Sequence, residues 1–402
     1  MDLVFLRILF FIIGSILIIG FFADYIFKKY RVPDVIILLL VGLILNFVGF
    51  RFVSTELIPI FSALALMFIL FEVGTELRFY YLIKEIPKAS LLAFSVFFIS
   101  MVLTAFLSTF ILNFFGYSLP FEIALVLGAI VGGSSSAVVA PITSKLTISK
   151  DIKSLLTIES ALTDALCVLV VITLLEGMAF TGSIGLTTLP NEIISSFSIA
   201  IVFGFIFGLF WLKVLPKVEK YEYYYLLTIG MLFLVYSLTE IVGGIGAISS
   251  LVFGVVLGNV GQIGKILYIR DAKPLTPMTN TFHKLIVFII RTFFFVVLGL
   301  IIYISDYLIM FYGILLTLFL FVIRYLLTKI AMLGANKFEN DLVAIMMPRG
   351  LAAAVLAPLP YLQYGIGSAA IFPDIVFSVI LFSSIIAFIG LMFLRYYSNE
   401  KF

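Results

Sequence analysis

The chain has 402 residues, of which 63% are apolar and 12% are charged, and its mean hydropathy is +1.27. Soluble domains are nearer half apolar and a quarter charged, so this composition excludes an ordinary soluble enzyme. The net charge of +3 does not indicate a nucleic-acid partner, and one Cys and one His exclude an internal disulfide and argue against a zinc or haem centre. We therefore expect an all-α polytopic membrane protein that is not an enzyme and needs no cofactor.

Apolar runs separated by charged or turn-rich breaks fill the sequence from end to end. A membrane-spanning helix needs about 20 mostly apolar residues, and this criterion predicts thirteen spans. In chain order they cover about 4–27, 33–50, 57–76, 88–114, 120–144, 152–176, 192–212, 222–240, 245–261, 279–303, 306–329, 340–361 and 373–396. The connections are too short to hold another domain, so we expect a single membrane domain over residues 1–402.

Lys and Arg gather in alternate connections of this series. The connections after odd-numbered spans, together with the C-terminus, carry almost all loop cations, whereas the opposite connections carry only Arg51. Cytoplasmic loops are the ones enriched in Lys and Arg. The pattern predicts a multi-pass protein of the cell membrane with its N-terminus outside and its C-terminus in the cytoplasm. It also assigns Arg324, just inside the end of its span, to the cytoplasmic side.

Two spans are interrupted by Gly, Ser and Pro near the middle of the membrane. The run 120–144 contains Gly132-Gly133-Ser134-Ser135-Ser136, and the run 340–361 contains Pro348-Arg349-Gly350. Broken helices are tolerated at that depth only against protein or water. The two breaks lie seven spans apart, which predicts two inverted six-helix repeats with crossing half-helices. Repeat one would cover about 1–176, a linker span about 192–212, and repeat two about 222–396.

A few ionisable side chains remain inside the apolar runs. Asp164, Arg291 and Arg349 fall near the middle of their spans, and Glu159 precedes Asp164 by about 140° of helix rotation. An ionised side chain at that depth costs on the order of 2.5–3.5 kcal/mol even on the insertion scale that penalises it least. We therefore expect these groups to meet around a hydrated cavity. One carboxylate can then pair with arginine while the other stays available for a transported ion.

These residues resemble the cation–proton antiporter superfamily, most closely its NhaP-type sodium–proton antiporters, over nearly the whole chain. The order, spacing and span placement of the matching stretches carry the resemblance. They are Val32–Ile36, Leu70–Leu77, Gly132–Pro141, Glu159–Ala165, Phe253–Asn259, Arg291–Gly299 and Pro348–Ala352.

The resemblance assigns roles to individual positions. It implies that Asp164 binds both Na⁺ and the proton, with Ser160 as a hydroxyl ligand of the sodium ion and Glu72 as a further carboxylate or proton-path residue. It also implies that Glu159 pairs with Arg349, and that Arg291 occupies the place where electroneutral members carry Arg. The resemblance also implies that the protein is a homodimer and works by an elevator type of alternating access.

Two departures from the family pattern touch the ion site. Thr163 stands where electrogenic members have a second Asp and the NhaP-like branch has Asn. Of the adjacent positions 163 and 164, only Asp164 then holds a titratable acid, which predicts one-for-one, electroneutral exchange. Ser134 and Ser135 fall where the NhaP-like branch usually has Thr-Asp-Pro. We include Thr163, Ser134 and Ser135 in the expected ion- and proton-binding set.

The sequence thus predicts a sodium (or lithium)–proton antiporter in which Na⁺ and H⁺ compete for one carboxylate. A K⁺–proton antiporter of the Kef kind is the first alternative, although such proteins usually carry a nucleotide-binding domain and this chain ends shortly after its last span. A proton-uncoupled cation channel and a transporter of organic anions are further alternatives. An intramembrane protease would need a Ser–His or paired-Asp constellation, and the single histidine, His283, lies at a span end.

Overall fold

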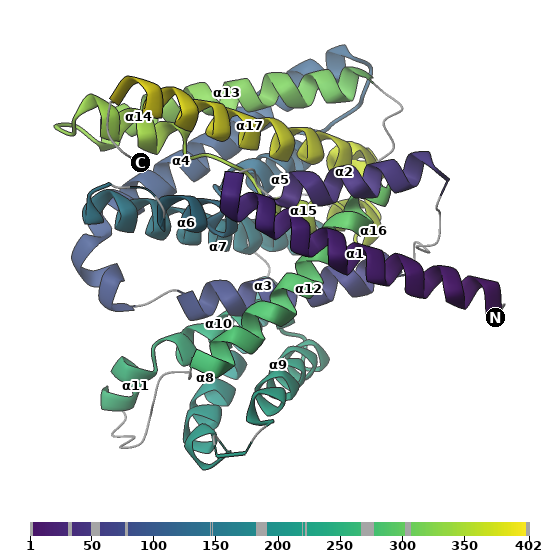
Figure 1. The fold of residues 1–402 in the computed structure, drawn as a ribbon, viewed down its shortest axis with the longest axis vertical. Helices are drawn as coiled ribbons and strands as arrows, with labels where there is room; N and C mark the ends of the chain where they lie inside the picture. Colours follow the sequence, from purple (N-terminus) through teal and green to yellow (C-terminus); the bar gives the residue numbers. More distant parts are fainter. Residues whose placement is uncertain are drawn as a thin grey trace.

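The computed structural model describes residues 3–30, 34–49, 57–76, 79–144, 146, 148–181, 191–218, 220–221, 223–266, 277–301 and 307–398. Throughout these residues the regular structure is helical and contains no strand (Figure 1). Mostly apolar segments favour helices in lipid because a helix satisfies its backbone hydrogen bonds internally. The expected all-α membrane architecture is confirmed.

The helices coincide with the apolar runs. The first half of the chain forms α1 (Leu3–Tyr30), α2 (Asp34–Phe47), α3 (Leu57–Glu76), α4 (Phe79–Phe114), α5 (Phe121–Val131), α6 (Ser136–Ser144) and α7 (Lys150–Thr181). The middle forms α8 (Asn191–Val218), α9 (Tyr224–Ile241), α10 (Gly246–Gly258), α11 (Val260–Ile266), α12 (Pro277–Ile301) and α13 (Tyr307–Ala331). The remainder forms α14 (Lys337–Ile345), α15 (Leu351–Leu356), α16 (Leu359–Leu362), the 3₁₀ helix η1 (Gly367–Ile371) and α17 (Phe372–Ser398).

Within the described part of the chain, six helices are long and apolar enough to cross a membrane by length and composition. They are α4, α7, α8, α9, α13 and α17, and the other apolar helices are shorter. Each of the thirteen apolar runs corresponds to one helix or to a helix that is interrupted. The count of thirteen spans stays a prediction, because length and composition alone do not place a helix across the bilayer.

Both interruptions expected from the sequence are present. The run 120–144 divides into α5 and α6 around Gly132–Ser135, and the run 340–361 divides into α14, α15 and α16 around Met346–Gly350. Gly133 packs so closely on α7 that a Cβ atom would overlap the Thr163 backbone and the Cys167 sulfur. The two breaks meet directly, since the Ser135 N–H donates a 2.8 Å hydrogen bond to the Pro348 carbonyl.

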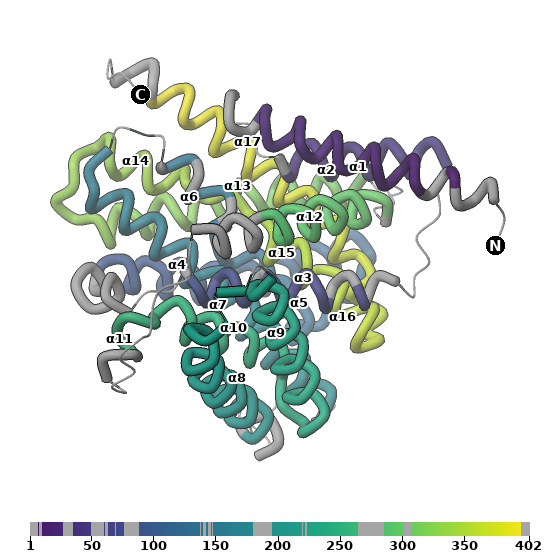
Figure 2. The backbone as a smooth tube through the Cα atoms, turned by 60° about the horizontal axis from the view of Figure 1, so that its bottom comes forward, coloured from purple at the N-terminus to yellow at the C-terminus, as the bar shows by residue number. Residues whose placement is uncertain are grey.

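The helices pack as two groups. The core group contains α4–α7 and α13–α17, whose members pack mainly on one another, and the panel group contains α1–α3 and α8–α12. Figures 1 and 2 both show α8, α9 and α10 at one side of the molecule and α13, α14 and α17 at the other. The groups meet chiefly where α2, α3, α8 and α12 touch α7, α15, α16 and α17. The broken helices lie at this meeting place.

Glycines allow the panel helices to approach backbone to backbone. Gly74 of α3 lies against Gly254 of α10, and Gly42 of α2 lies against Gly299 of α12. Small residues have this effect in membrane helices generally. If the repeats are offset by seven spans, α3 of the first repeat corresponds to α12 of the second, and α2 corresponds to α10. The contact of α3 with α10 is then the counterpart of the contact of α12 with α2. This correspondence favours the inverted repeat, which remains a prediction.

We predict that Gly74→Ala destabilises the panel group, because its Cβ would overlap the Leu251 carbonyl oxygen of α10. Overpacking of this kind costs about 1–3 kcal/mol. The matched control is Gly230→Ala in α9, where an added Cβ meets no atom within 4 Å. Heating the detergent-purified variants and measuring the folded fraction by size exclusion should give a lower melting temperature for Gly74→Ala only. Equal melting of both variants would contradict this packing.

Candidate ion-binding site

Asp164 of α7 lies beside the break in the first interrupted helix. Its Oδ2 atom accepts a 2.8 Å hydrogen bond from the Ser136 N–H and a 2.6 Å hydrogen bond from the Ser136 hydroxyl. Ser136 is the first residue of α6, so its N–H lacks a partner inside that helix and the positive end of the helix dipole faces the carboxylate. Asp164 is 7% exposed. The half-helix therefore stabilises a negative charge that would otherwise be costly here.

The serine that holds Asp164 differs from the serines expected from the sequence. Ser134 and Ser135 were the predicted ion-binding residues of this segment, whereas the residue bonded to Asp164 is Ser136. The signal that could have identified it is the preference of Ser for helix N-termini after a glycine-rich break. A run of three serines offers three candidates, and only the exact start of α6 distinguishes them.

Ser134 and Thr163 tie the break to α7. The Ser134 N–H donates to the Thr163 hydroxyl at 3.1 Å, and that hydroxyl lies 3.2 Å from the Ser134 carbonyl oxygen. Both side chains are buried. Thr163 therefore occupies a bridging position between the two elements, next in sequence to Asp164.

Ser160 is fully buried on α7. Its hydroxyl donates to the Thr157 carbonyl of the same helix at 3.2 Å. The proton of the hydroxyl is thereby engaged, while its oxygen lone pairs stay available to accept or to coordinate. Its role as a sodium ligand remains a prediction.

Glu159 forms the ion pair of this region, but with a partner that differs from the predicted one. Arg324 of α13 donates two parallel hydrogen bonds to it, from Nη1 to Oε1 at 2.9 Å and from Nη2 to Oε2 at 3.0 Å, and both side chains are fully buried. The Ser134 hydroxyl also donates to the Glu159 carboxylate and lies 3.1 Å from each of its oxygens. The hydrogen-bonded partner of Glu159 is therefore Arg324 and not the expected Arg349, which interacts with Glu159 electrostatically without a hydrogen bond. A bidentate guanidinium already occupies both carboxylate oxygens.

The sequence analysis counted Arg324 with the cations of the predicted cytoplasmic side and did not predict that it pairs with Glu159. The side chain is buried in the protein interior, and its Nε also donates to the Val343 carbonyl at 3.2 Å. Its position inside an apolar run was a signal for burial. Charge counting over span ends does not distinguish a cation that faces the loop from one turned toward the core.

The remaining predicted residues lie on other helices. Arg349, in the second break, is 1% exposed and its backbone N–H donates to the Ser383 hydroxyl at 2.9 Å. Arg291 lies part-buried on α12 and is not among the partners of Glu159. Glu72 lies part-buried on α3, where it interacts electrostatically with Tyr225 of α9. The structure thus gathers the α7 residues and the two breaks, while Glu72 and Arg291 belong to the panel group.

A sequence profile of the family described as "Sodium/hydrogen exchanger, transmembrane" matches residues 11–394. The chain belongs to this family. Among solved structures, the sodium proton antiporter MjNhaP1 from Methanocaldococcus jannaschii at pH 8 has a TM-score of 0.77 and 23% identity, covering 98% of this chain and 100% of that one. This likeness confirms the NhaP-like fold that the sequence predicted.

Two curated relatives of this exchanger family are similar over part of their length. The Na(+)/H(+) antiporter ApNhaP of Aphanothece halophytica is 31% identical over 280 residues, which cover 67% of this chain and 50% of that protein. The "Probable Na(+)/H(+) antiporter 2" of Methanocaldococcus jannaschii is 27% identical over 293 residues, which cover 68% of this chain and 64% of that protein. The matches therefore span half to somewhat under two thirds of these relatives.

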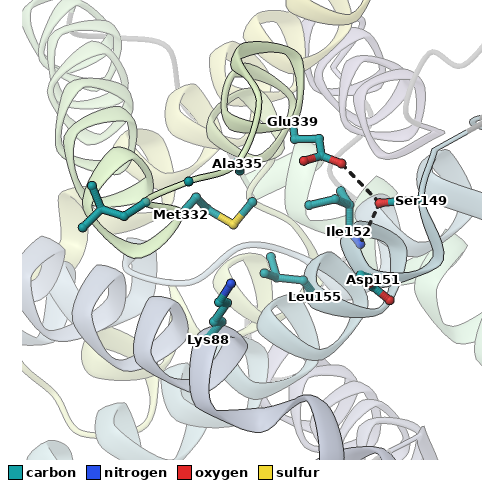
Figure 3. Close-up of a pocket in the computed structure, with 10 residues that line it drawn as sticks. Lys88, Ser149, Asp151, Ile152, Leu155, Met332, Ala335 and Glu339 are labelled. Carbon is teal, nitrogen blue, oxygen red and sulfur yellow. Dashed lines mark hydrogen bonds between the residues drawn. The ribbon is translucent and has the colours of Figure 1, made fainter.

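A separate cavity opens in the core group, where α4 and α7 begin and α13 connects to α14. It measures about 620 Å³, and Lys88, Ser149, Asp151, Met332 and Glu339 are among the residues that line it (Figure 3). Figure 3 shows Ser149 bridging the Glu339 carboxylate and the Ile152 N–H, at 3.4 Å each. None of the residues predicted to bind ions lines this cavity, so it is distinct from the Asp164 site.

We predict that Arg324→Met destabilises the protein because it leaves the Glu159 carboxylate buried without its cation. Breaking a buried pair in this way costs about 3–5 kcal/mol, so the melting temperature should fall markedly. Lys329→Met, at an exposed position of the same helix, is the matched control. The double variant Glu159→Met/Arg324→Met should recover much of the loss, since no unpaired charge remains. Melting of Arg324→Met at the control temperature would show that the pair contributes little.

Proposed function

We propose that this protein is a secondary active sodium (or lithium)–proton antiporter in which Asp164 carries either Na⁺ or H⁺. The observation that carries the proposal is the position of Asp164. Its carboxylate is buried beside two interrupted helices and is held by the first residue of a half-helix. Membership of the sodium/hydrogen exchanger family supports the same function.

The chemistry of the site suits a hard monovalent cation. The Asp164 carboxylate is bonded by the Ser136 hydroxyl, and Ser160 and Thr163 carry further hydroxyl oxygens on the same helix, one turn before Asp164 and next to it in sequence. Oxygen ligands favour such cations over soft metals. Na⁺ and H⁺ would then compete for Asp164, and the charged, empty carboxylate would be costly to move because burial penalises an unpaired ion. Coupling follows from that cost, with Glu72 as a further carboxylate on the proton path.

The division into two groups supports an elevator mechanism for this exchange. Asp164 and both breaks belong to the core group, whose helices pack more extensively on one another than on the panel group. We propose that the core group slides against a panel that forms a homodimer in the cell membrane. The N-terminus would face outside and the C-terminus the cytoplasm, as the distribution of Lys and Arg predicts.

We predict that Asp164→Asn abolishes exchange while the protein stays folded, because the amide neither takes up a proton nor balances a sodium ion. The measurement is dissipation of a preset pH gradient in proteoliposomes on addition of Na⁺. Asp151→Asn, at an exposed position of the same helix, is the matched control and should retain exchange. Retained sodium-dependent proton flux in Asp164→Asn would remove Asp164 from the mechanism.

The same assay separates the proposed function from its alternative. Na⁺ and Li⁺ should dissipate the gradient in the unmodified protein, and K⁺ should not. Dissipation by K⁺ alone would favour the Kef-type reading, and cation flux without proton movement would favour a channel.

We further predict electroneutral exchange, because Thr163 leaves Asp164 as the single acid of its pair. One Na⁺ would then exchange for one H⁺ without net charge transfer. An imposed membrane potential should therefore leave the rate of sodium-driven proton flux in proteoliposomes unchanged. A rate that rises or falls with the potential would contradict one-for-one exchange.

A further inference from the structure

Ser136 directs two hydrogen-bond donors at one oxygen of Asp164. Its backbone N–H lies 2.8 Å from Oδ2, and its hydroxyl lies 2.6 Å from the same atom. Both side chains are buried. An O–H donor approaches an ionised carboxylate more closely than it approaches a neutral acceptor, and the bond is about twice as strong. The hydroxyl distance is that of a donor to an ionised carboxylate.

The backbone donor is fixed in place by the crossing of the two breaks. The Ser135 N–H is hydrogen-bonded to the Pro348 carbonyl, and the Ser135 carbonyl accepts a 2.9 Å hydrogen bond from the Val139 N–H. The carbonyl of Ser135 and the N–H of Ser136 belong to one planar peptide unit, so holding the carbonyl also holds the N–H. The Ser136 N–H is therefore a fixed donor to Asp164.

The hydroxyl of Ser136 is the adaptable donor. A serine hydroxyl can rotate, and it offers one proton and two lone pairs. It can donate to an ionised carboxylate, accept from a protonated one, or present its oxygen to a cation bound at Oδ2. The hydroxyls of Ser160 and Thr163 direct their protons at backbone carbonyls, each at 3.2 Å. Of these three hydroxyls, that of Ser136 is the one bonded to the Asp164 carboxylate.

We propose that Ser136 sets the competition between Na⁺ and H⁺ at Asp164, with its hydroxyl as a donor to the empty carboxylate and as an oxygen ligand of the bound cation. This role rests on the proposed antiport function. The hydroxyl oxygen and Oδ2 are 2.6 Å apart, so rotation of the O–H bond and a small separation of the two oxygens make room for a cation between them. Hydroxyl and carboxylate oxygens are suitable ligands for a hard cation.

The other charged and titratable groups around Asp164 come from several elements. Arg349 of the second break and Cys167 of α7 interact with it electrostatically. The buried ion pair of Glu159 lies about one turn earlier on α7, and α3, which packs on α7, carries Glu72. None of these groups changes when a single hydroxyl is removed. A shift in the ion competition can therefore be assigned to that hydroxyl.

Ser136→Ala removes the hydroxyl and keeps the backbone N–H. Loss of the donor destabilises the ionised carboxylate, which favours protonation, and loss of the oxygen ligand weakens sodium binding. Both changes let H⁺ displace Na⁺ more readily. Because a hydrogen bond to a charged group changes a binding constant by about tenfold or more, we expect the KM for Na⁺ to rise by about tenfold at constant pH. The maximal rate should be retained, and the acidic limb of the pH profile should move to higher pH by about one unit.

The measurement is sodium-driven dissipation of a preset pH gradient in proteoliposomes, over a range of Na⁺ concentrations and pH values. Ser136→Thr keeps a hydroxyl and should restore both the KM and the pH profile. Ser95→Ala of α4, whose hydroxyl bonds the Leu92 carbonyl of its own helix at 3.2 Å, is the control and should behave as the unmodified protein does. A merely structural role would lower the maximal rate or the yield of folded protein without moving the pH profile.

Ser136→Cys is the second test, which serves if Ser136→Ala does not fold. Its thiol is a weak donor and a poor ligand for sodium, so it should raise the KM as alanine does. An unchanged KM and pH profile in either folded variant would overturn the role of Ser136, and so would equal impairment of a folded Ser136→Thr. Failure of both the Ala and the Cys variants to fold would make Ser136 structural and would also overturn it. Absence of sodium-driven exchange in the unmodified protein would instead refute the proposed antiport function.

Discussion

A charge buried inside a membrane protein must be matched, and this constraint organises the centre of the molecule. Four ionisable groups meet where the two interrupted helices touch α7. The Glu159–Arg324 pair is complete in itself, because a bidentate guanidinium and the Ser134 hydroxyl fill both carboxylate oxygens. Asp164 is held by Ser136 at the start of α6. The guanidinium of Arg349 interacts electrostatically with both carboxylates and makes no hydrogen bond with the described residues.

The interruptions make this meeting possible. A continuous helix satisfies its own backbone and offers nothing but side chains, whereas a break exposes N–H and carbonyl groups at mid-membrane depth. Here the exposed groups are used in two ways. Ser135 and Pro348 join the breaks to each other, and Ser136 directs the start of α6 at Asp164. The site is therefore built from backbone as much as from side chains, and its geometry is fixed by the crossing.

The two groups of helices differ in how they are held. Within the panel group, glycines bring α3 onto α10 and α2 onto α12 with backbone contact. Within the core group, the buried ion pair links α7 to α13 across the first break. Contacts between the groups are sparser than contacts within them. Such a division would suit the relative sliding that the proposed function requires.

The sequence alone determined the all-helical membrane architecture, the positions of the helices and the location of both breaks. These are local properties, since apolar length sets a span and Gly or Pro interrupts it. It also singled out Glu159 and Asp164, because acidic residues inside an apolar run stand out. Only the tertiary structure decided which groups touch: that Glu159 pairs with Arg324 rather than Arg349, and that Ser136 rather than its two neighbours holds Asp164. Such choices depend on the rotation and depth of helices distant in sequence, and hydropathy and charge patterns do not encode them.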